Sequence, residues 1–150
     1  AGKKAYNAIK QKSYDLSYVA MGSMMVMVSI EGDKATIAHV GDSRYYLKDK
    51  VRLLYQTEIH VRIDFGWEIV SRCFFSYHPK SLFPTSGSSP FKKGDRFLLC
   101  SDGLYKSMAS DILQAGMFDD KPLEEIFDEF DSISRKQCDD NHTAILIEIE

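Results

Sequence analysis

The most constraining feature of the sequence is a series of short apolar segments separated by brief turns in its first third. Residues 24–30 and 35–40 predict two strands joined by Glu31-Gly32-Asp33-Lys34, which contains the Gly and Asp that hairpin turns use. A second pair of strands is predicted at residues 45–47 and 51–55. Because parallel strands need long crossover connections, this close spacing predicts an antiparallel sheet.

The rest of the chain mixes helices with further strands. Helical patterns cover residues 3–16, 110–115 (ended by Gly116) and 122–136. Apolar segments at residues 97–100 and 143–149 predict two more strands, whereas residues 81–90, rich in Ser, Pro and Gly, predict a surface loop. The expected fold class is therefore α+β, with antiparallel strands and a pair of helices inserted before the last strand.

Composition narrows the classes of function. The formal net charge is -3, and 44% hydrophobic with 27% charged residues is typical of a globular protein, which excludes global disorder. A dedicated nucleic-acid binder needs an excess of basic residues that this chain lacks. Apolar runs are far shorter than the roughly 20 residues that cross a bilayer. We therefore expect neither nucleic acid nor a membrane as a partner.

Length and cysteine content set the expected organisation. A chain of 150 residues predicts a single domain over residues 1–150. Its three cysteines form no C-x-x-C pair, which argues against a disulfide framework and favours the reducing cytoplasm. Much of the acidity after residue 105 falls on one face of the helix at 122–136, where charge runs are typical of solvation. Asp102 and Asp139-Asp140 are not explained in this way.

Three segments share a pattern in which an apolar strand meets an Asp beside a turn residue. The three aspartates are Asp42 in Val40-Gly41-Asp42, Asp102 in Ser101-Asp102-Gly103, and Asp140 in Asp139-Asp140-Asn141. Each alone is explained by turn formation, since Asp, Gly and Asn all favour turns. Together they predict carboxylates that converge at one edge of a sheet. Such a cluster requires a neutralising cation, and oxygen ligands favour Mg²⁺ or Mn²⁺ over zinc.

In order and spacing, these segments resemble the motifs of the type 2C family of metal-dependent protein serine/threonine phosphatases. Met21-Gly22-Ser23-Met24 is similar to the M-G-T/S-T motif, and Val40-Gly41-Asp42-Ser43-Arg44 to V-G-D-S-R. Residues 98–104 are similar to L-L-x-S-D-G-L, and residues 140–143 to D-N-x-T. The resemblance covers roughly residues 3–150. It implies two stacked antiparallel β-sheets flanked by helices, an α-β-β-α sandwich.

The resemblance also implies a chemistry. Two divalent ions, Mg²⁺ or Mn²⁺, activate a water that attacks phosphoserine or phosphothreonine, without a phosphoenzyme. By matching position, Asp102 and Asp140 are expected to be metal ligands. Asp42 matches an acid that holds a further, weaker metal in some bacterial relatives, and the alternative is a structural role in its turn. The implied partner is a phosphorylated protein substrate of a serine/threonine kinase pathway.

The chain departs from the family pattern at its beginning. The D-G-x-G-G loop, whose Asp bridges both metals, and the first strand, with its phosphate-binding Arg, are both absent. We therefore expect a catalytic domain that is incomplete at its N-terminus, with weak or no activity of its own. Two explanations stay open: a fragment of a phosphatase, or a shortened, non-catalytic regulatory or scaffold domain.

Smaller features leave further alternatives open. A third hypothesis is a metal-dependent hydrolase that acts on a small phosphate ester. Thr57-Glu58-Ile59-His60 only loosely resembles the family's T-x-D-H-S segment, and the region up to Phe91 matches a variable flap on the substrate side. His39 is predicted to be packed within a strand, and His142 to lie at the surface or in the core rather than in the site. The aromatic Trp67 is expected to anchor the flap or to line a partner surface.

Overall fold

The computed structural model describes residues 2–15, 21–76 and 84–150. The helices are α1 (Gly2–Asp15), α2 (Asp102–Tyr105), α3 (Ser110–Gly116) and α4 (Leu123–Gln137). The strands are β1 (Gly22–Ser23), β2 (Met25–Glu31), β3 (Lys34–Val40), β4 (Arg44–Lys48), β5 (Leu53–Gln56), β6 (Val61–Asp64), β7 (Trp67–Val70), β8 (Phe74–Phe75), β9 (Thr85–Pro90), β10 (Arg96–Cys100) and β11 (Ala144–Glu148).

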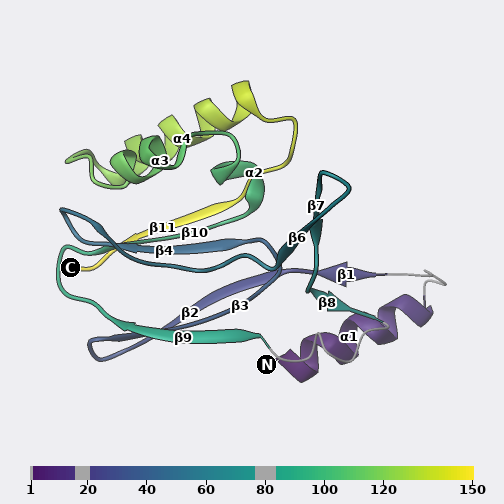
Figure 1. The fold of residues 1–150 in the computed structure, drawn as a ribbon. Coiled ribbons are helices and arrows are strands. Elements are labelled where there is room, and N and C mark those ends of the chain that lie inside the picture. Colours follow the sequence, from purple (N-terminus) through teal and green to yellow (C-terminus); the bar gives the residue numbers. More distant parts are fainter. Residues whose placement is uncertain (1, 16–20, 77–83) are drawn as a thin grey trace.

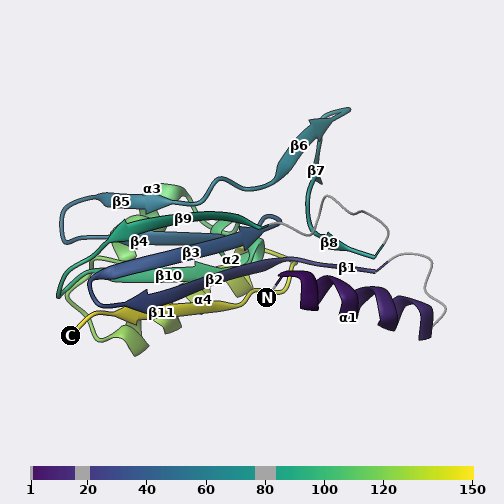
Figure 2. The same ribbon diagram turned by 90° about the horizontal axis from the view of Figure 1, so that it is seen from below.

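Two antiparallel sheets stack on one another (Figure 1). One has the strand order β11-β10-β4-β5 and the other β2-β3-β9. Helices α2, α3 and α4 cover the outer face of the four-stranded sheet, and α1 lies beside the small β1–β8 pair at one end (Figures 1 and 2). These antiparallel layers with their helices confirm the predicted α+β fold class.

The four-stranded sheet is the central layer, because its inner strands are buried on both faces. Along β10, Phe97 and Leu99 face the other sheet, whereas Leu98 and Cys100 face the helices. Side chains of successive strand residues point to opposite faces, so two separate cores share one strand. The helix-side core also takes in α4, whose predicted apolar face contributes Ile126 and Phe130.

The predicted loop at residues 81–90 is wrong for its second half. Thr85–Pro90 forms β9, which pairs with β3 in a continuous antiparallel register from His39 opposite Thr85 to Lys34 opposite Pro90. Residues 81–83 lie outside the described part of the chain. The strand forms because β3 has a second edge with unpaired backbone groups, and these override the weak strand propensity of Ser and Gly. β9 is the edge of its sheet, where Pro is tolerated.

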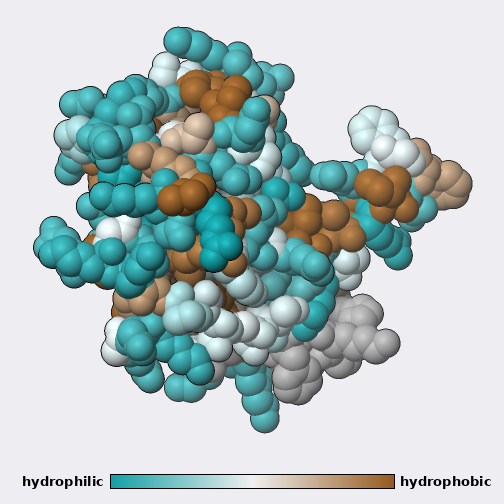
Figure 3. Space-filling view, turned by 60° about the vertical axis from the view of Figure 1, so that its left-hand side comes forward, coloured by the Kyte–Doolittle hydropathy of each residue, from teal (hydrophilic) through white to brown (hydrophobic). Residues whose placement is uncertain are grey.

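A hairpin made of β6 and β7 projects away from the stacked sheets (Figures 1 and 2). Its apolar side chains face solvent: Phe65 is 97% exposed and Trp67 is 76% exposed. The projecting arm in Figure 3 accordingly has brown, hydrophobic atoms at its surface. Among the described residues, no helix is long and apolar enough to cross a membrane.

Candidate functional site

Strand register brings the three predicted aspartates to one end of the central sheet. Arg44 pairs with Cys100, and Cys100 pairs with Ala144, so β4 begins, β10 ends and β11 begins at this same end. Asp42 precedes β4, Asp102 follows β10, and Asp140 precedes β11. We call this the aspartate end.

Close backbone contacts hold the three segments together there. The backbone N–H of Ser101 donates to the Thr143 carbonyl at 3.0 Å, and the Thr143 N–H donates to Ser101 Oγ at 3.0 Å. A Cβ on Gly103 would lie 2.4 Å from the Asn141 carbonyl oxygen, so only glycine allows this approach. The Tyr105 hydroxyl donates to the Asp42 carbonyl at 3.0 Å. The start of α2 therefore contacts both of the other segments.

Asp42 is the most enclosed of the three, with 6% of its surface exposed. Burial raises the pKa of its carboxyl group, and the negative charges of Asp102 and Asp140 raise it further. Lys106 and a hydrogen bond from the backbone act in the opposite direction. The three carboxylates thus interact electrostatically, and Lys106 is the cation that lowers the pKa of Asp42.

Lys106 is the cation that the structure places against this cluster. Its ammonium group lies 3.2 Å from Asp102 Oδ2 and 3.1 Å from Glu68 Oε2 on strand β7. Although burial opposes the effect, the hydrogen bonds to Glu68 and Asp102 raise the pKa of Lys106. Lys106 therefore joins the projecting hairpin to the aspartate end.

The donor chemistry of the aspartate end fits a hard divalent cation, since it offers carboxylate oxygens. The set is not closed, however. Within residues 2–15, 21–76 and 84–150, no three His, Cys, Asp or Glu side chains are placed to hold a metal ion. The described carboxylates thus offer suitable donor atoms but do not form a complete set of metal ligands.

Neighbouring residues have supporting roles. The Arg44 guanidinium lies 3.9 Å from the centre of the Tyr105 ring and donates to the Tyr46 hydroxyl at 3.3 Å. His142 is engaged by α4, since its Nε2 lies 2.7 Å from Asp131 Oδ1. His39 is buried, as predicted. Lys106 was missed from the sequence, although its spacing of four residues from Asp102 could have indicated the pair.

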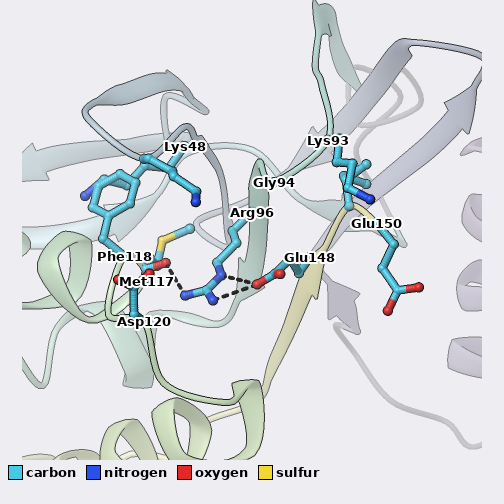
Figure 4. A pocket seen from close by; sticks show the side chains of 11 residues that line it. Lys48, Lys93, Gly94, Arg96, Met117, Phe118, Asp120, Glu148 and Glu150 are labelled. Carbon is cyan, nitrogen blue, oxygen red and sulfur yellow. Dashed lines mark hydrogen bonds and ion pairs between the residues drawn. The ribbon is translucent and has the colours of Figure 1, made fainter.

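The other end of the same sheet contains a cavity of about 490 Å³ (Figure 4). Lys48, only 5% exposed, donates to the Gln114 carbonyl at 2.6 Å and lies over the Phe118 ring. Burial lowers the pKa of Lys48 to about 8. Arg96 donates to Glu148 Oε2 at 2.6 Å. We call this the basic end.

Comparison with known proteins was made for sequence and for structure. No family model matches the chain. The serine/threonine protein phosphatase PstP of Mycobacterium tuberculosis is 30% identical over 130 residues, covering 77% of this chain and 25% of PstP. A bacterial serine phosphatase bearing an R161K mutation superposes with a TM-score of 0.87 at 21% identity, covering 99% of this chain and 67% of that one.

A third match is the catalytic domain of PstP in complex with two manganese ions, with a TM-score of 0.75 and 20% identity. It covers 97% of this chain and 67% of that one. This chain spans about a quarter of the length of the curated relatives that it matches and about two thirds of the solved structures. The resemblance indicated by the motifs is confirmed: the chain has the fold of the type 2C serine/threonine phosphatases.

Proposed function

We propose that the chain is part of a protein serine/threonine phosphatase, in which Asp102 and Asp140 bind a divalent cation, Mg²⁺ or Mn²⁺. The supporting observation is the convergence of three carboxylates at one end of the central sheet, where Asp102 and Asp140 raise the pKa of the buried Asp42. Sequence similarity to PstP, a serine/threonine phosphatase, supports the reaction class.

When bound, a pair of divalent ions supplies an activated water and screens the charge of the phosphoryl oxygens. The chain's own residues have simpler tasks in this proposal. Asp102 and Asp140 hold the cation from segments next to two neighbouring strands, β10 and β11, and the contact of Gly103 with Asn141 holds these segments together. Asp42 adds negative charge from a buried position and so strengthens cation binding.

We also propose the biological setting. The substrates are phosphorylated proteins of a serine/threonine kinase pathway, and the setting is cytoplasmic signalling. The described cysteines, Cys73, Cys100 and Cys138, are all unpaired, which agrees with a reducing compartment. The domain spans residues 1–150 and is expected to be incomplete without the bridging Asp of the family.

A second candidate function is a non-catalytic regulatory or scaffold domain with the same fold. It is favoured by one observation: Lys106 already engages Asp102 with an ammonium group where a cation would bind. In this case the aspartate end is neutralised by the protein itself, and it needs no metal.

The two candidates are separated by Mn²⁺ titration of the chain in a calorimeter. The proposed function predicts saturable binding that falls at least tenfold in Asp102→Asn and in Asp140→Asn, because each substitution removes a charged ligand. Asp128→Asn, on the exposed face of α4, is the matched control and should bind like the wild type. Equal binding by all four proteins would exclude the proposed ligands.

Turnover of p-nitrophenyl phosphate and of phosphopeptides with Mn²⁺ is measured in the same proteins. We expect at most feeble turnover, since a dinuclear centre needs more carboxylates than Asp102 and Asp140. Robust turnover would contradict the incomplete ligand set. A preference for small phosphate esters over phosphopeptides would contradict a protein substrate.

A further inference from the structure

Gly41 has a backbone conformation that residues with a side chain rarely adopt. Its φ is +102°, and a Cβ there would lie 2.3 Å from Met24 Cγ. Glycine is thus required at this position, but its backbone also has more conformational freedom than that of any other residue. Asp42 follows directly, so the direction of its carboxylate depends on what holds this turn.

Two hydrogen bonds from one residue hold Gly41. The backbone N–H of His60 donates to the Gly41 carbonyl at 2.9 Å, and His60 Nδ1 accepts the Gly41 N–H at 3.1 Å. Because Nδ1 accepts, the proton of the neutral ring lies on Nε2. That nitrogen is 2.9 Å from Thr85 Oγ1, to which it donates. Hydrogen bonds at both ring nitrogens therefore fix the orientation of the His60 ring.

The surroundings keep His60 neutral. Its ring stacks on that of His39, with centroids 4.7 Å apart and planes 4° from parallel. His39 is 3% exposed, and its Nε2 lies 2.8 Å from the Glu58 carbonyl. Burial, and then the charges of His39 and Arg72, lower the pKa of His60 to about 4. At neutral pH, Nδ1 is thus free to act as an acceptor.

We propose that His60 is a positioning residue: it holds Gly41 through its ring and its backbone, and so fixes the Asp42 carboxylate at the aspartate end. The Tyr105 hydroxyl on α2 holds the next carbonyl, that of Asp42. The turn is therefore held by the connection between β5 and β6 and by α2. The effect of His60 on cation binding rests on the proposed function, whereas its effect on the Gly41 turn does not.

Two substitutions of His60 distinguish the role of Nδ1, which contacts Gly41, from that of Nε2, which contacts Thr85. In His60→Asn the side-chain oxygen can take the place of Nδ1 and accept from Gly41. In His60→Gln the longer side chain reaches toward Thr85 and leaves the Gly41 N–H without an acceptor. The first readout is the hydrogen-exchange rate of the Gly41 amide, measured by NMR in the full chain without metal. The amide of Leu98, in the central sheet, reports whether the fold is intact.

We expect Gly41 exchange to be at least about tenfold faster in His60→Gln and close to wild type in His60→Asn, with Leu98 unchanged in both. Equal protection in both variants would overturn the inference, and so would equal loss in both. Faster exchange at Leu98 in step with Gly41 would also overturn it, because the effect would then be general destabilisation.

A Mn²⁺ titration of the same proteins tests the link to the cation. We expect His60→Gln to bind several-fold more weakly than His60→Asn. If the wild type binds no Mn²⁺ while the exchange pattern is as expected, the proposed function fails and the positioning role of His60 stands. If Mn²⁺ binds equally to both variants, Asp42 is not positioned for the cation and the inference fails.

Discussion

The two ends of the four-stranded sheet differ in how their charged side chains are balanced. At the basic end, the Arg96 guanidinium donates to Glu148 and to the carbonyls of Met117 and Asp119, so its charge is balanced and its donors are engaged. At the aspartate end, Lys106 pairs with Asp102 and Glu68, while the buried Asp42 has the negative charges of Asp102 and Asp140 beside it. The difference indicates that the basic end contributes to stability, whereas the aspartate end keeps unbalanced charge of the kind that binds a ligand.

The largest effect is expected from Arg96→Met at the basic end. It leaves Glu148 and two carbonyl groups without their donor, so the free energy of unfolding should fall by about 2–4 kcal/mol. Urea denaturation followed by circular dichroism measures this. Arg62→Met, in an exposed pair with Asp64, is the control and should change stability by less than about 0.5 kcal/mol. Unchanged stability in Arg96→Met would show that the basic end does not contribute to stability in the way proposed here.

Gly103→Ala is expected to damage the aspartate end through its backbone. The added Cβ would lie 2.4 Å from the Asn141 carbonyl oxygen, which must move. The free energy of unfolding should fall by about 1–3 kcal/mol, and Mn²⁺ affinity should fall with it. Ser110→Ala, at an exposed position of α3, is the control and should change neither the free energy of unfolding nor the Mn²⁺ affinity. A Gly103→Ala protein with wild-type stability would show that the segment at 140–143 is loosely packed.

Asp42→Asn should move stability and cation affinity in opposite directions. Because the pKa of Asp42 is raised in the folded protein, its ionisation destabilises the fold as pH rises above about 4. The melting temperature of the variant should therefore exceed that of the wild type by about 2–4 °C at pH 7 and match it below pH 4. Calorimetric scans across this range measure the difference. A variant that is less stable at pH 7 would indicate a structural role for the Asp42 carboxylate.

The smallest effect is expected from Lys106→Met. Removing the ammonium group frees Asp102, so Mn²⁺ should bind about 2- to 5-fold more tightly at low salt, and less so at high salt. Lys121→Met, which breaks an ion pair with Asp119 far from Asp102, is the control. Weaker Mn²⁺ binding in Lys106→Met would show that the lysine supports the site rather than competing for it.

The sequence was most informative where chemistry depends on short, rigid segments. The strands at 35–40 and 97–100 and the Asp residues beside them could be predicted, because hydrophobic alternation and turn residues act over a few positions. The strand at 85–90 could not, since its Ser and Gly residues form a strand only when β3 lies alongside. The contacts of Lys106 with Glu68 and of His60 with Gly41 could not be predicted either, because these partners are distant in sequence.

By itself, the sequence determined the α+β class, the central strands and the residue types of a candidate carboxylate site. Local propensity and period-two alternation are properties of neighbouring residues, so the sequence contains them directly. Only the tertiary structure decided that β4, β10 and β11 bring their aspartates to one end, with Lys106 beside them and His60 behind Gly41. The physical reason is that register and long-range hydrogen bonds join segments that no local pattern connects.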